Sequence, residues 1–453
     1  MKKIVSLLLV LLLVVPCALA EELDFSGAVE QEEVTDEQVL EAMYGAYPPS
    51  DLLSQTLPED KKTVTILSHY SLGEAKEYFN KLFGGEIVEV ICGVSEYASK
   101  LTNMIASGNA PDLVVCESST NPSVAVYANA GLVQPFDPYI DYTVPELAGL
   151  KDTYDAGIWN GSHYLAPYTD KPLYFLIYNP VIFEEYGLET PWELWEKGEW
   201  TWEAFEALCE KLTRDTDNDG VIDRYAMMSF SSHLIPAALV SNGAGFVQVD
   251  ENGKYYNAAE TDAFLEAMNW VMDMVSKYEM KAPEGAEWNY FESAFINGEV
   301  ALQVHEDYFA GSLSNMEDDY GFVFFPKGPR VDTYLYAPSD NIMVIPACYD
   351  ADRAWKIAFA YNLFTNPTPG YTDSDDWKNG YYQKYRDERA VDETIAMMRE
   401  PEHQFVWYSD MVTGYDLGSQ YIWDVYAQAT TPAEKAESMR GTWQAYIDEA
   451  NAN

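Results

Sequence analysis

A short acidic loop has oxygen atoms at the spacing of a calcium site. Residues 215–223 read DTDNDGVID, in which carboxylates at alternate positions precede a glycine that allows a sharp turn. The predicted metal ligands are the side chains of Asp215, Asp217, Asp219 and Asp223 and the backbone carbonyl of Val221. The twelfth position, where such loops carry a bidentate Glu, is Ala226. We expect structural calcium here, completed by water or a distant carboxylate; the alternative is an ion-free turn rich in Asp and Gly.

Motifs for enzyme chemistry are scarce. The sequence has no Gly-x-Ser-x-Gly, no phosphate loop ending in Gly-Lys-Ser/Thr and no His-Glu-x-x-His. Its five histidines are scattered, which argues against a zinc cluster. A carboxylate pair can hydrolyse a glycosidic bond, but 74 acidic residues single out no pair. We therefore expect a protein that is not an enzyme, and keep an exported glycan-active hydrolase as the alternative.

Aromatic side chains are the more informative excess, at 14% of the chain with 12 Trp and 34 Tyr. Flat rings stack on the apolar faces of sugars, while neighbouring carboxylates and amides bind the hydroxyls. Ligands bind beyond the strand ends of open α/β sheets. We therefore take as candidates the polar and aromatic residues that lie at such strand ends or in irregular segments. The candidate ligand-binding residues are Tyr70, Glu117, Ser118, Asp170, Trp288, Glu306, Asp307, Tyr308, Asp340 and Asn341.

The elements that must position these residues follow an alternating order. Apolar runs of strand length are KTVTILSHY, EIVEVIC and DLVVC, and the segments between them, SLGEAKEYFNKLFGG and SEYASKLTNMIASG, have helical spacing. Strands that alternate with helices predict a parallel sheet covered on both faces. Further along, TWEAFEALCEKL, TDAFLEAMNWVMDMVSKY and ADRAWKIAFAYNLF predict helices, and EVALQVHEDY, YGFVFFP and NIMVIP predict strands. A chain of 453 residues favours two lobes, with PYTDKPLYFLIYN as a crossing between them.

The first 20 residues have the form of an export signal. Two lysines precede an apolar run over residues 4–15 and a small-residue cleavage motif at 18–20. Pro16 before Cys17, and the better cleavage site after it, argue against a lipid anchor at Cys17. We predict an exported protein that is extracellular, at the cell surface or periplasmic.

The net charge limits the possible binding partners, and the cysteine pattern indicates the state of the thiols. The formal net charge of −47 would repel nucleic acid and anionic lipid, and excludes both as partners. Four cysteines follow the signal, Cys92, Cys116, Cys209 and Cys348, and none forms a Cys-x-x-Cys pair. We expect them to be free, buried thiols.

The order of the segments resembles a known family. From about Thr63 to Phe364 the chain carries GNAPDLVV, ANAGLVQPFDPYI, GSHYLAPYTDKPLYFLIYNPVIFEEYGLETP, GEWTWEAFEALCEKLT, FESAFINGEVALQVHEDYFAG and DADRAWKIAFAYNLF. In this order they resemble the extracellular solute-binding proteins of ABC importers, in the carbohydrate-binding, maltodextrin-binding-like group. No one of these motifs is diagnostic, whereas the ordered set is fairly specific.

The resemblance implies a periplasmic-binding-protein-like α/β fold of two lobes, each a mainly parallel sheet flanked by helices, with a hinge between them. It maps residues 1–20 to the signal peptide and 21–60 to an acidic N-terminal extension. Lobe one takes 61–169 with 333–367, and lobe two takes 170–332 with 368–453. Tyr308 stands where the family often has a sugar-contacting aromatic residue. His305-Glu306-Asp307 departs from the family's small-residue turn, and its extra acids would favour a cationic or amino sugar.

The leading hypothesis is therefore a sugar or oligosaccharide receptor, monomeric, that delivers its ligand to ABC permease subunits. Its mechanism would be hinge closure, since a ligand that binds the closed form better shifts the population toward it. A calcium-triggered adhesion module is a third possibility, but such modules usually repeat their acidic loops and this chain has one.

Overall fold

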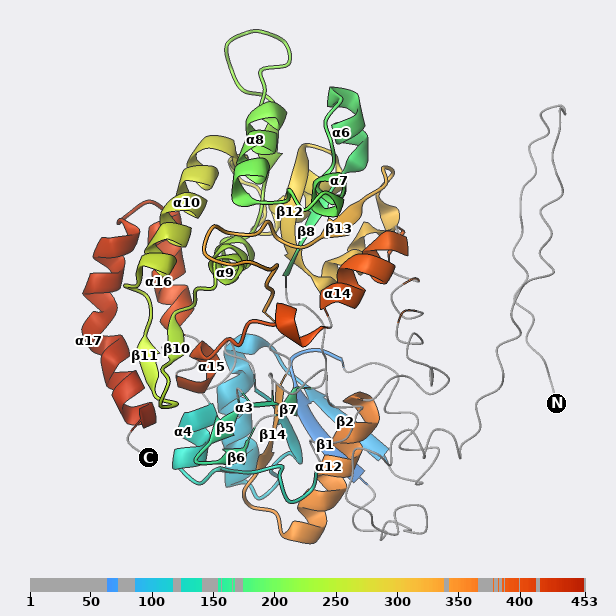
Figure 1. Cartoon of the computed structure of the whole chain (residues 1–453). Helices are drawn as coiled ribbons and strands as arrows, with labels where there is room; N and C mark the ends of the chain where they lie inside the picture. Colours follow the sequence, from blue (N-terminus) through green and yellow to red (C-terminus); the bar gives the residue numbers. More distant parts are fainter. Residues whose placement is uncertain are drawn as a thin grey trace, which may run out of the picture.

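The computed structural model describes two lobes, each built on its own β-sheet (Figure 1). The described residues are 63–71, 86–116, 124–140, 154–155, 157–164, 166–167, 174–337, 342–365, 378, 382, 385–386, 388–398, 400–412 and 416–451. The predicted signal, the predicted extension and the predicted helix SLGEAKEYFNKLFGG lie outside them. None of the helices in this part of the chain is long and apolar enough to cross a membrane.

Lobe one holds the sheet with strand order β2-β1-β3-β14-β4, in which β7 also pairs with β14. Its strands are β1 (Thr63–Ser68), β2 (Glu86–Ile91), β3 (Leu113–Val115), β4 (Val133–Gln134), β7 (Ala166–Pro167) and β14 (Ile342–Pro346). The helices α3 (Val94–Ala106), α4 (Val124–Asn129) and α12 (Ala351–Thr365), and a small hairpin of β5 (Ile158–Trp159) and β6 (Ser162–His163), complete the lobe.

Lobe two holds the sheet with strand order β13-β8-β12-β9, and most of the remaining helices. Its strands are β8 (Tyr174–Tyr178), β9 (Tyr225–Met227), β12 (Val300–Glu306) and β13 (Gly321–Val323), and β10 (Val247–Val249) pairs with β11 (Tyr255–Asn257). Its helices before the C-terminal region are α6 (Pro180–Tyr186), α7 (Pro191–Glu196), α8 (Trp202–Leu212), α9 (Ser231–Ser241), α10 (Asp262–Tyr278), α11 (Tyr290–Ile296) and the 3₁₀ helix η4 (Asp307–Asn315).

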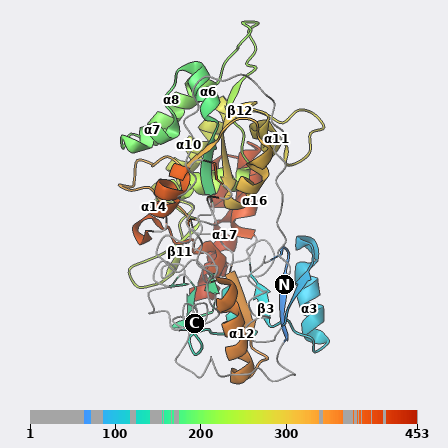
Figure 2. The ribbon, with the colours of Figure 1, turned by 90° about the vertical axis from the view of Figure 1, so that its right-hand side faces the viewer.

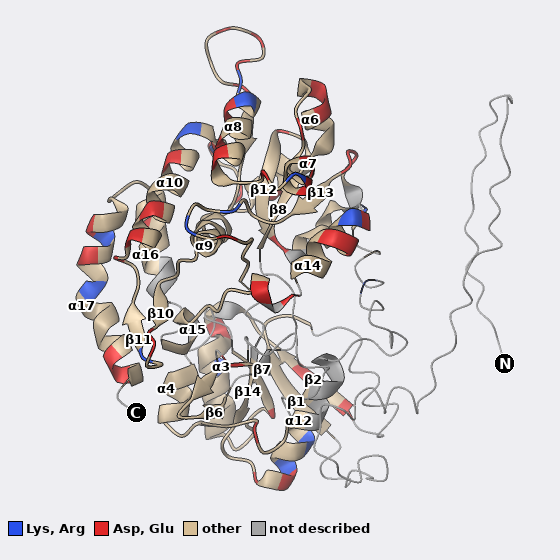
Figure 3. Ribbon diagram, in the orientation of Figure 1, with Lys and Arg blue, Asp and Glu red and all other residues tan. Residues whose placement is uncertain are grey.

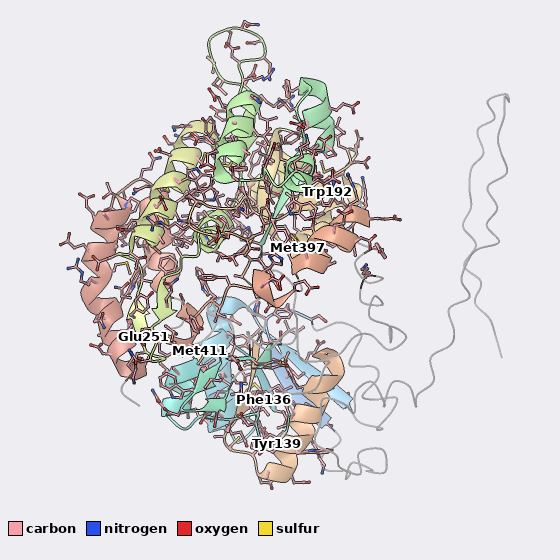
Figure 4. All side chains as sticks on the ribbon, viewed as in Figure 1. Phe136, Tyr139, Trp192, Glu251, Met397 and Met411 are labelled. Carbon is pink, nitrogen blue, oxygen red and sulfur yellow. The ribbon has the colours of Figure 1, made fainter. Side chains whose placement is uncertain are left out.

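The C-terminal region packs on lobe two and touches lobe one. It comprises η5 (Ala390–Ile395), α14 (Ala396–Met398), η6 (Pro401–His403), α15 (Ser409–Val412), α16 (Asp416–Tyr426) and α17 (Pro432–Asn451). Helix α16 packs on α9 and α17 packs on α10, whereas α15 packs against α4 of lobe one. Met411 of α15 is buried at this contact (Figure 4). The rings of Trp159 in lobe one and Tyr255 in lobe two also stack, with centroids 6.4 Å apart.

In each sheet one strand runs against the others, and it is the strand that receives the chain from the other lobe. Strand β14 is antiparallel to β3, β4 and β7, while β1 is parallel to β2 and β3. Strand β8 is antiparallel to β12 and β13, while β12 is parallel to β9. The predicted two-lobed, mainly parallel α/β fold is confirmed in these sheets. The exact lobe boundaries stay a prediction.

Local packing explains why these segments fold as they do. The buried Tyr97 of α3 donates its hydroxyl to the carbonyls of Leu67 (2.6 Å) and Val115 (2.9 Å), and so ties the helix to the ends of β1 and β3. Helix α8 begins at a Thr201 cap and buries Trp202, which stacks on Trp270 of α10 with centroids 4.1 Å apart. These apolar helix faces are the ones that the sequence periodicity predicts.

The cysteine prediction is correct in part. All four are free, and Cys116 and Cys209 are buried. Cys92 is half-buried, and Cys348 is exposed because it lies in the turn after β14 rather than inside the strand. The prediction that all four thiols are buried is therefore wrong for Cys348.

Candidate functional site

The strand directions bring two sheet edges together at the boundary between the lobes. Strand β8 enters lobe two at Tyr174, so the carboxyl ends of β9, β12 and β13, which run against it, lie at the same edge. Strand β14 enters lobe one at Ile342, beside the carboxyl end of β3 and near that of β1. Residues that follow β1 and β3 therefore face the lobe boundary from one side, and residues that follow β9 and β12 face it from the other.

On the lobe-one edge, β1 ends in a tight turn at His69 and Tyr70. The hydroxyl of Ser68 donates to the carbonyl of Tyr70 (2.7 Å) and accepts from the Tyr70 amide (3.1 Å), which fixes the turn. The ring of His69 meets that of Tyr70 edge-on, with centroids 4.8 Å apart. The turn thus places an aromatic residue at the predicted position, just beyond the strand.

On the lobe-two edge, four rings form one cluster, which we call the aromatic wall: Phe230, Trp288, Phe291 and Trp423. Phe230 follows β9 and stacks on Phe291 of α11, with centroids 5.6 Å apart. Trp288 and Trp423 meet Phe230 edge-on, at 6.2 Å and 5.7 Å. Trp288 is 74% exposed and Trp423 is 49% exposed, although apolar rings of this size are usually covered. Figure 2 shows α11 of lobe two and α3 of lobe one toward the same side of the molecule.

Two histidine–carboxylate pairs adjoin the aromatic wall. The ring of His233, on the first turn of α9, lies 5.3 Å from that of Phe230, and its Nε2 atom is 3.2 Å from Oε1 of Glu306. Glu306 is the last residue of β12, opposite Tyr174 of β8. The second pair is formed by Nε2 of His305 and Oε1 of Glu292, 3.5 Å apart.

His305 is held as a neutral ring. Burial, with a smaller contribution from neighbouring His233, lowers the pKa of His305 to about 2. Its Nδ1 atom accepts the backbone N–H of Glu306 at 2.8 Å, so the single ring proton lies on Nε2, toward Glu292. His305 can therefore donate one hydrogen bond but brings no positive charge to either carboxylate.

Further polar groups lie on the first turn of α9. Ser231 and His233 are 2% and 6% exposed, and within the described chain Ser231 Oγ and His233 Nδ1 have no hydrogen-bond partner. Buried polar atoms rarely stay unpaired, so these two point to a partner other than the described residues.

A buried carboxylate, that of Glu279, is hydrogen-bonded to two of the segments that carry the aromatic wall. Glu279, at the end of α10, accepts the Ser229 amide at 3.1 Å and the Tyr426 hydroxyl at 2.6 Å. Ser229 precedes Phe230, and Tyr426 lies one helical turn after Trp423. Burial raises the pKa of Glu279 to about 7, although both hydrogen bonds lower it. One side chain thus connects two of the segments that carry the wall.

The hinge lies next to this edge. Tyr336, on the second segment that crosses between the lobes, donates its amide to the carbonyl of His403 (2.9 Å) and accepts the Phe405 amide (2.8 Å). A small cavity is lined by Tyr174 and Tyr336 from the two crossings and by Ala237 of α9, among others. The two crossings and α9 thus meet around this cavity.

The predicted ligand residues fall into three groups. Tyr70, Trp288 and Glu306 are at the lobe boundary or on the aromatic wall. Asp307 and Tyr308 open the helix η4, because β12 ends at Glu306 and not at Tyr308 as predicted; the structure describes only their backbone. The remaining five, Glu117, Ser118, Asp170, Asp340 and Asn341, lie outside the described residues.

Four residues at this site were not among the predicted ligand residues: Phe230, His233, Glu292 and Trp423. Phe230 follows the short strand YAM, which the sequence pattern did not predict, so the rule of looking beyond strand ends had no strand to apply to there. Trp423 has no such signal, because it lies on a helix among other apolar residues.

The acidic loop lies at the far end of lobe two, beyond α8 and away from the lobe boundary (Figure 1). Oxygen atoms of Asp215, Asp217 and Asp223 come within 4.8 Å of one another. The Asp219 and Gly220 amides donate to Asp215 at 3.1 Å and 2.7 Å, which coils the loop around its first carboxylate. Asp223 accepts the Thr216 amide and hydroxyl, and Val221 is exposed.

Comparison with known proteins identifies the architecture. A family model described as bacterial extracellular solute-binding protein matches residues 71–360. An ABC substrate-binding protein of Listeria monocytogenes, solved with cycloalternan, is 17% identical with a TM-score of 0.60, over 85% of this chain and 97% of its own. The maltose-maltodextrin-binding protein of Alicyclobacillus acidocaldarius is 16% identical with a TM-score of 0.55, over 84% and 100%.

UgpB of Mycobacterium tuberculosis, solved with glycerophosphocholine, is 16% identical with a TM-score of 0.57, over 85% of this chain and 98% of its own. At these identities the solved structures show a shared fold. No curated protein matches the sequence.

Proposed function

The chain belongs to the bacterial extracellular solute-binding proteins, and we propose that it captures a sugar or oligosaccharide between its lobes for an ABC transporter permease. The observation that carries the proposal is the aromatic wall at the lobe boundary, with two exposed tryptophans that connect through Phe230 and His233 to Glu306. Rings of this kind stack on the apolar faces of sugars, and carboxylates and histidines bind the hydroxyls. Sugars and oligosaccharides are also the ligands named for several proteins of this fold, including the one solved with cycloalternan.

The mechanism is closure of the lobes on the ligand. The lobes already touch where Trp159 stacks on Tyr255 and where α15 packs on α4, so this side can act as a pivot. A sugar held by both edges binds the closed form better than the open form and shifts the population toward it. No bond of the sugar is made or broken, so the protein is a receptor and not an enzyme.

Export and the oligomeric state belong to the same proposal. A chain of this family works outside the cytoplasm, and the first 20 residues supply a cleavable signal for that purpose. We propose that the exported receptor is a monomer, with the acidic loop binding calcium as a structural clip. The loop supports this with three carboxylates around one point, far from the aromatic wall.

The test compares a tryptophan variant with a tyrosine variant, by calorimetry against a panel of sugars. Trp288→Ala removes the most exposed ring of the aromatic wall and should weaken sugar binding about tenfold or more. Tyr256→Ala removes another exposed ring, on the β10–β11 hairpin, and should leave binding unchanged. Equal loss in both variants, or none in Trp288→Ala, would contradict the assignment of the site.

A glycan-active hydrolase is the alternative that this panel also tests. An enzyme would convert an oligosaccharide during the titration, whereas the receptor returns it intact. Chromatography of the sugar after prolonged incubation with the protein distinguishes the two.

A further inference from the structure

We propose that the captured carbohydrate carries a protonated amino group, which binds at Glu306 while its ring stacks on the aromatic wall. This inference rests on the proposed function and names the class of sugar. Its basis is the negative charge beside the wall, where Glu306 and Glu292 lie without a Lys or Arg partner in the described chain, and the contact of the rings with this acidic region.

In the described chain the carboxylates of the site lack a Lys or Arg partner. Within the described chain, Glu306 and Glu292 form ion-pair contacts only with histidines, and none with Lys or Arg. The side chains of Glu306 and Glu292 are 32% and 22% exposed, so both are already largely removed from water. The histidine next to Glu292 is neutral His305, because its lowered pKa keeps the ring uncharged at any physiological pH.

The rings and the carboxylate form one continuous surface. Trp288 contacts Phe230, Phe230 contacts His233, and His233 contacts Glu306, each through the distances given above. Tyr174 of the hinge also lies on this surface, with its ring 5.7 Å from that of His233. A sugar ring on the wall can therefore hold a substituent at Glu306.

Closure of the lobes makes a cationic substituent bind better at Glu306 than a neutral one. When lobe one covers Glu306, its carboxylate loses the water that now solvates it, and an unpaired buried charge is costly. A sugar hydroxyl donates one hydrogen bond to this carboxylate. An ammonium group donates charge-assisted hydrogen bonds and also neutralises the negative charge of the carboxylate. The electron-rich faces of Trp288 and Trp423 also attract a cation.

The negative net charge of the whole protein also favours a cationic ligand. The sequence has 74 acidic and 27 basic residues, and acidic side chains occur on helices of both lobes (Figure 3). Such a field attracts cationic solutes and repels anionic ones. It therefore disfavours a phosphorylated or carboxylated sugar at this site.

The experiment is calorimetry with sugars that differ only at one carbon. The panel contains the parent hexose, the 2-amino hexose and the N-acetylated hexose in gluco, galacto and manno forms, together with the trisaccharides of cellulose, chitosan and chitin. The proposal predicts that an amino sugar binds about tenfold or more tighter than its neutral partners, and that added salt reduces the preference. Glycerophosphocholine, a zwitterion that carries a quaternary ammonium group but no sugar, should bind weakly.

Two variants locate the effect. Glu306→Gln keeps the shape and removes the charge, so it should reduce the preference for the amino sugar while neutral sugars lose far less. Glu251→Gln removes an exposed carboxylate on the β10–β11 hairpin and should change nothing. Tyr174 and His233 stay unchanged in both variants, so the surface itself is preserved.

The outcomes separate this inference from the proposed function. If a neutral or N-acetylated sugar binds as tightly as its amino partner, or Glu306→Gln keeps the full preference, the inference is wrong and the receptor function stands. If no sugar binds, or glycerophosphocholine alone binds, both are wrong.

Discussion

Glu279→Gln should change how the stability of lobe two depends on pH. The wild-type carboxyl is 7% exposed, and burial raises its pKa from the ordinary value of 4.5 to about 7. A raised pKa means that the protonated form is favoured by folding. Its stabilising contribution is therefore complete below about pH 4.5 and is lost as the pH rises through about 7.

The magnitude follows from the two pKa values. The difference between 4.5 and about 7, at 1.36 kcal/mol per pH unit, is about 3 kcal/mol of unfolding free energy. Glutamine keeps the size of the side chain and can still accept the Ser229 amide, but it does not ionise. The free energy of unfolding of the variant, minus that of the wild type, should thus rise by about 3 kcal/mol between about pH 4.5 and about pH 8.

Urea unfolding followed by tryptophan fluorescence measures this difference, since most of the described tryptophans lie in lobe two. Subtracting the wild type at each pH cancels the titration of the other acidic residues. Glu251→Gln, on an exposed turn, is the control and should give a difference that does not depend on pH. If the difference for Glu279→Gln does not change with pH, ionisation of this buried carboxyl does not destabilise the folded protein, and the reasoning is refuted.

Three further predictions test the fold and the acidic loop. Tyr97→Phe should destabilise lobe one by about 1–3 kcal/mol in urea unfolding, because two buried strand-end carbonyls lose their donor. Gly321→Ala should lower the melting temperature, since a Cβ there would overlap the ring of Tyr178; the same change at the open Gly311 should do so far less. Chelation of calcium should lower the melting temperature and leave sugar affinity almost unchanged; loss of sugar binding in protein that is still folded would refute the role of the loop as a clip.

The sequence predicts the fold well because hydrophobic spacing is a local property. The helical face of TWEAFEALCEKL and the apolar run TVTILS each carry their own period, and both form the elements expected. The direction of β8 and β14 is not local. It depends on which lobe delivers the chain to each strand, and only the assembled sheets show it.

The site is harder to predict for the same reason. Trp288, Glu306 and Tyr70 are recognisable because they stand at strand ends or in an irregular segment. The aromatic wall also needs Trp423, which reaches Phe230 from a helix far along the chain. Its exposure results from tertiary packing, and a helix of mixed apolar residues gives no sign of it.

Calorimetric titration of the exported chain with the sugar panel shows whether this protein is a sugar receptor. A sugar receptor should bind one sugar class saturably at a single site, and the sugar should be recovered intact. Heat from no sugar at all, or heat that continues as a sugar is consumed, would contradict it.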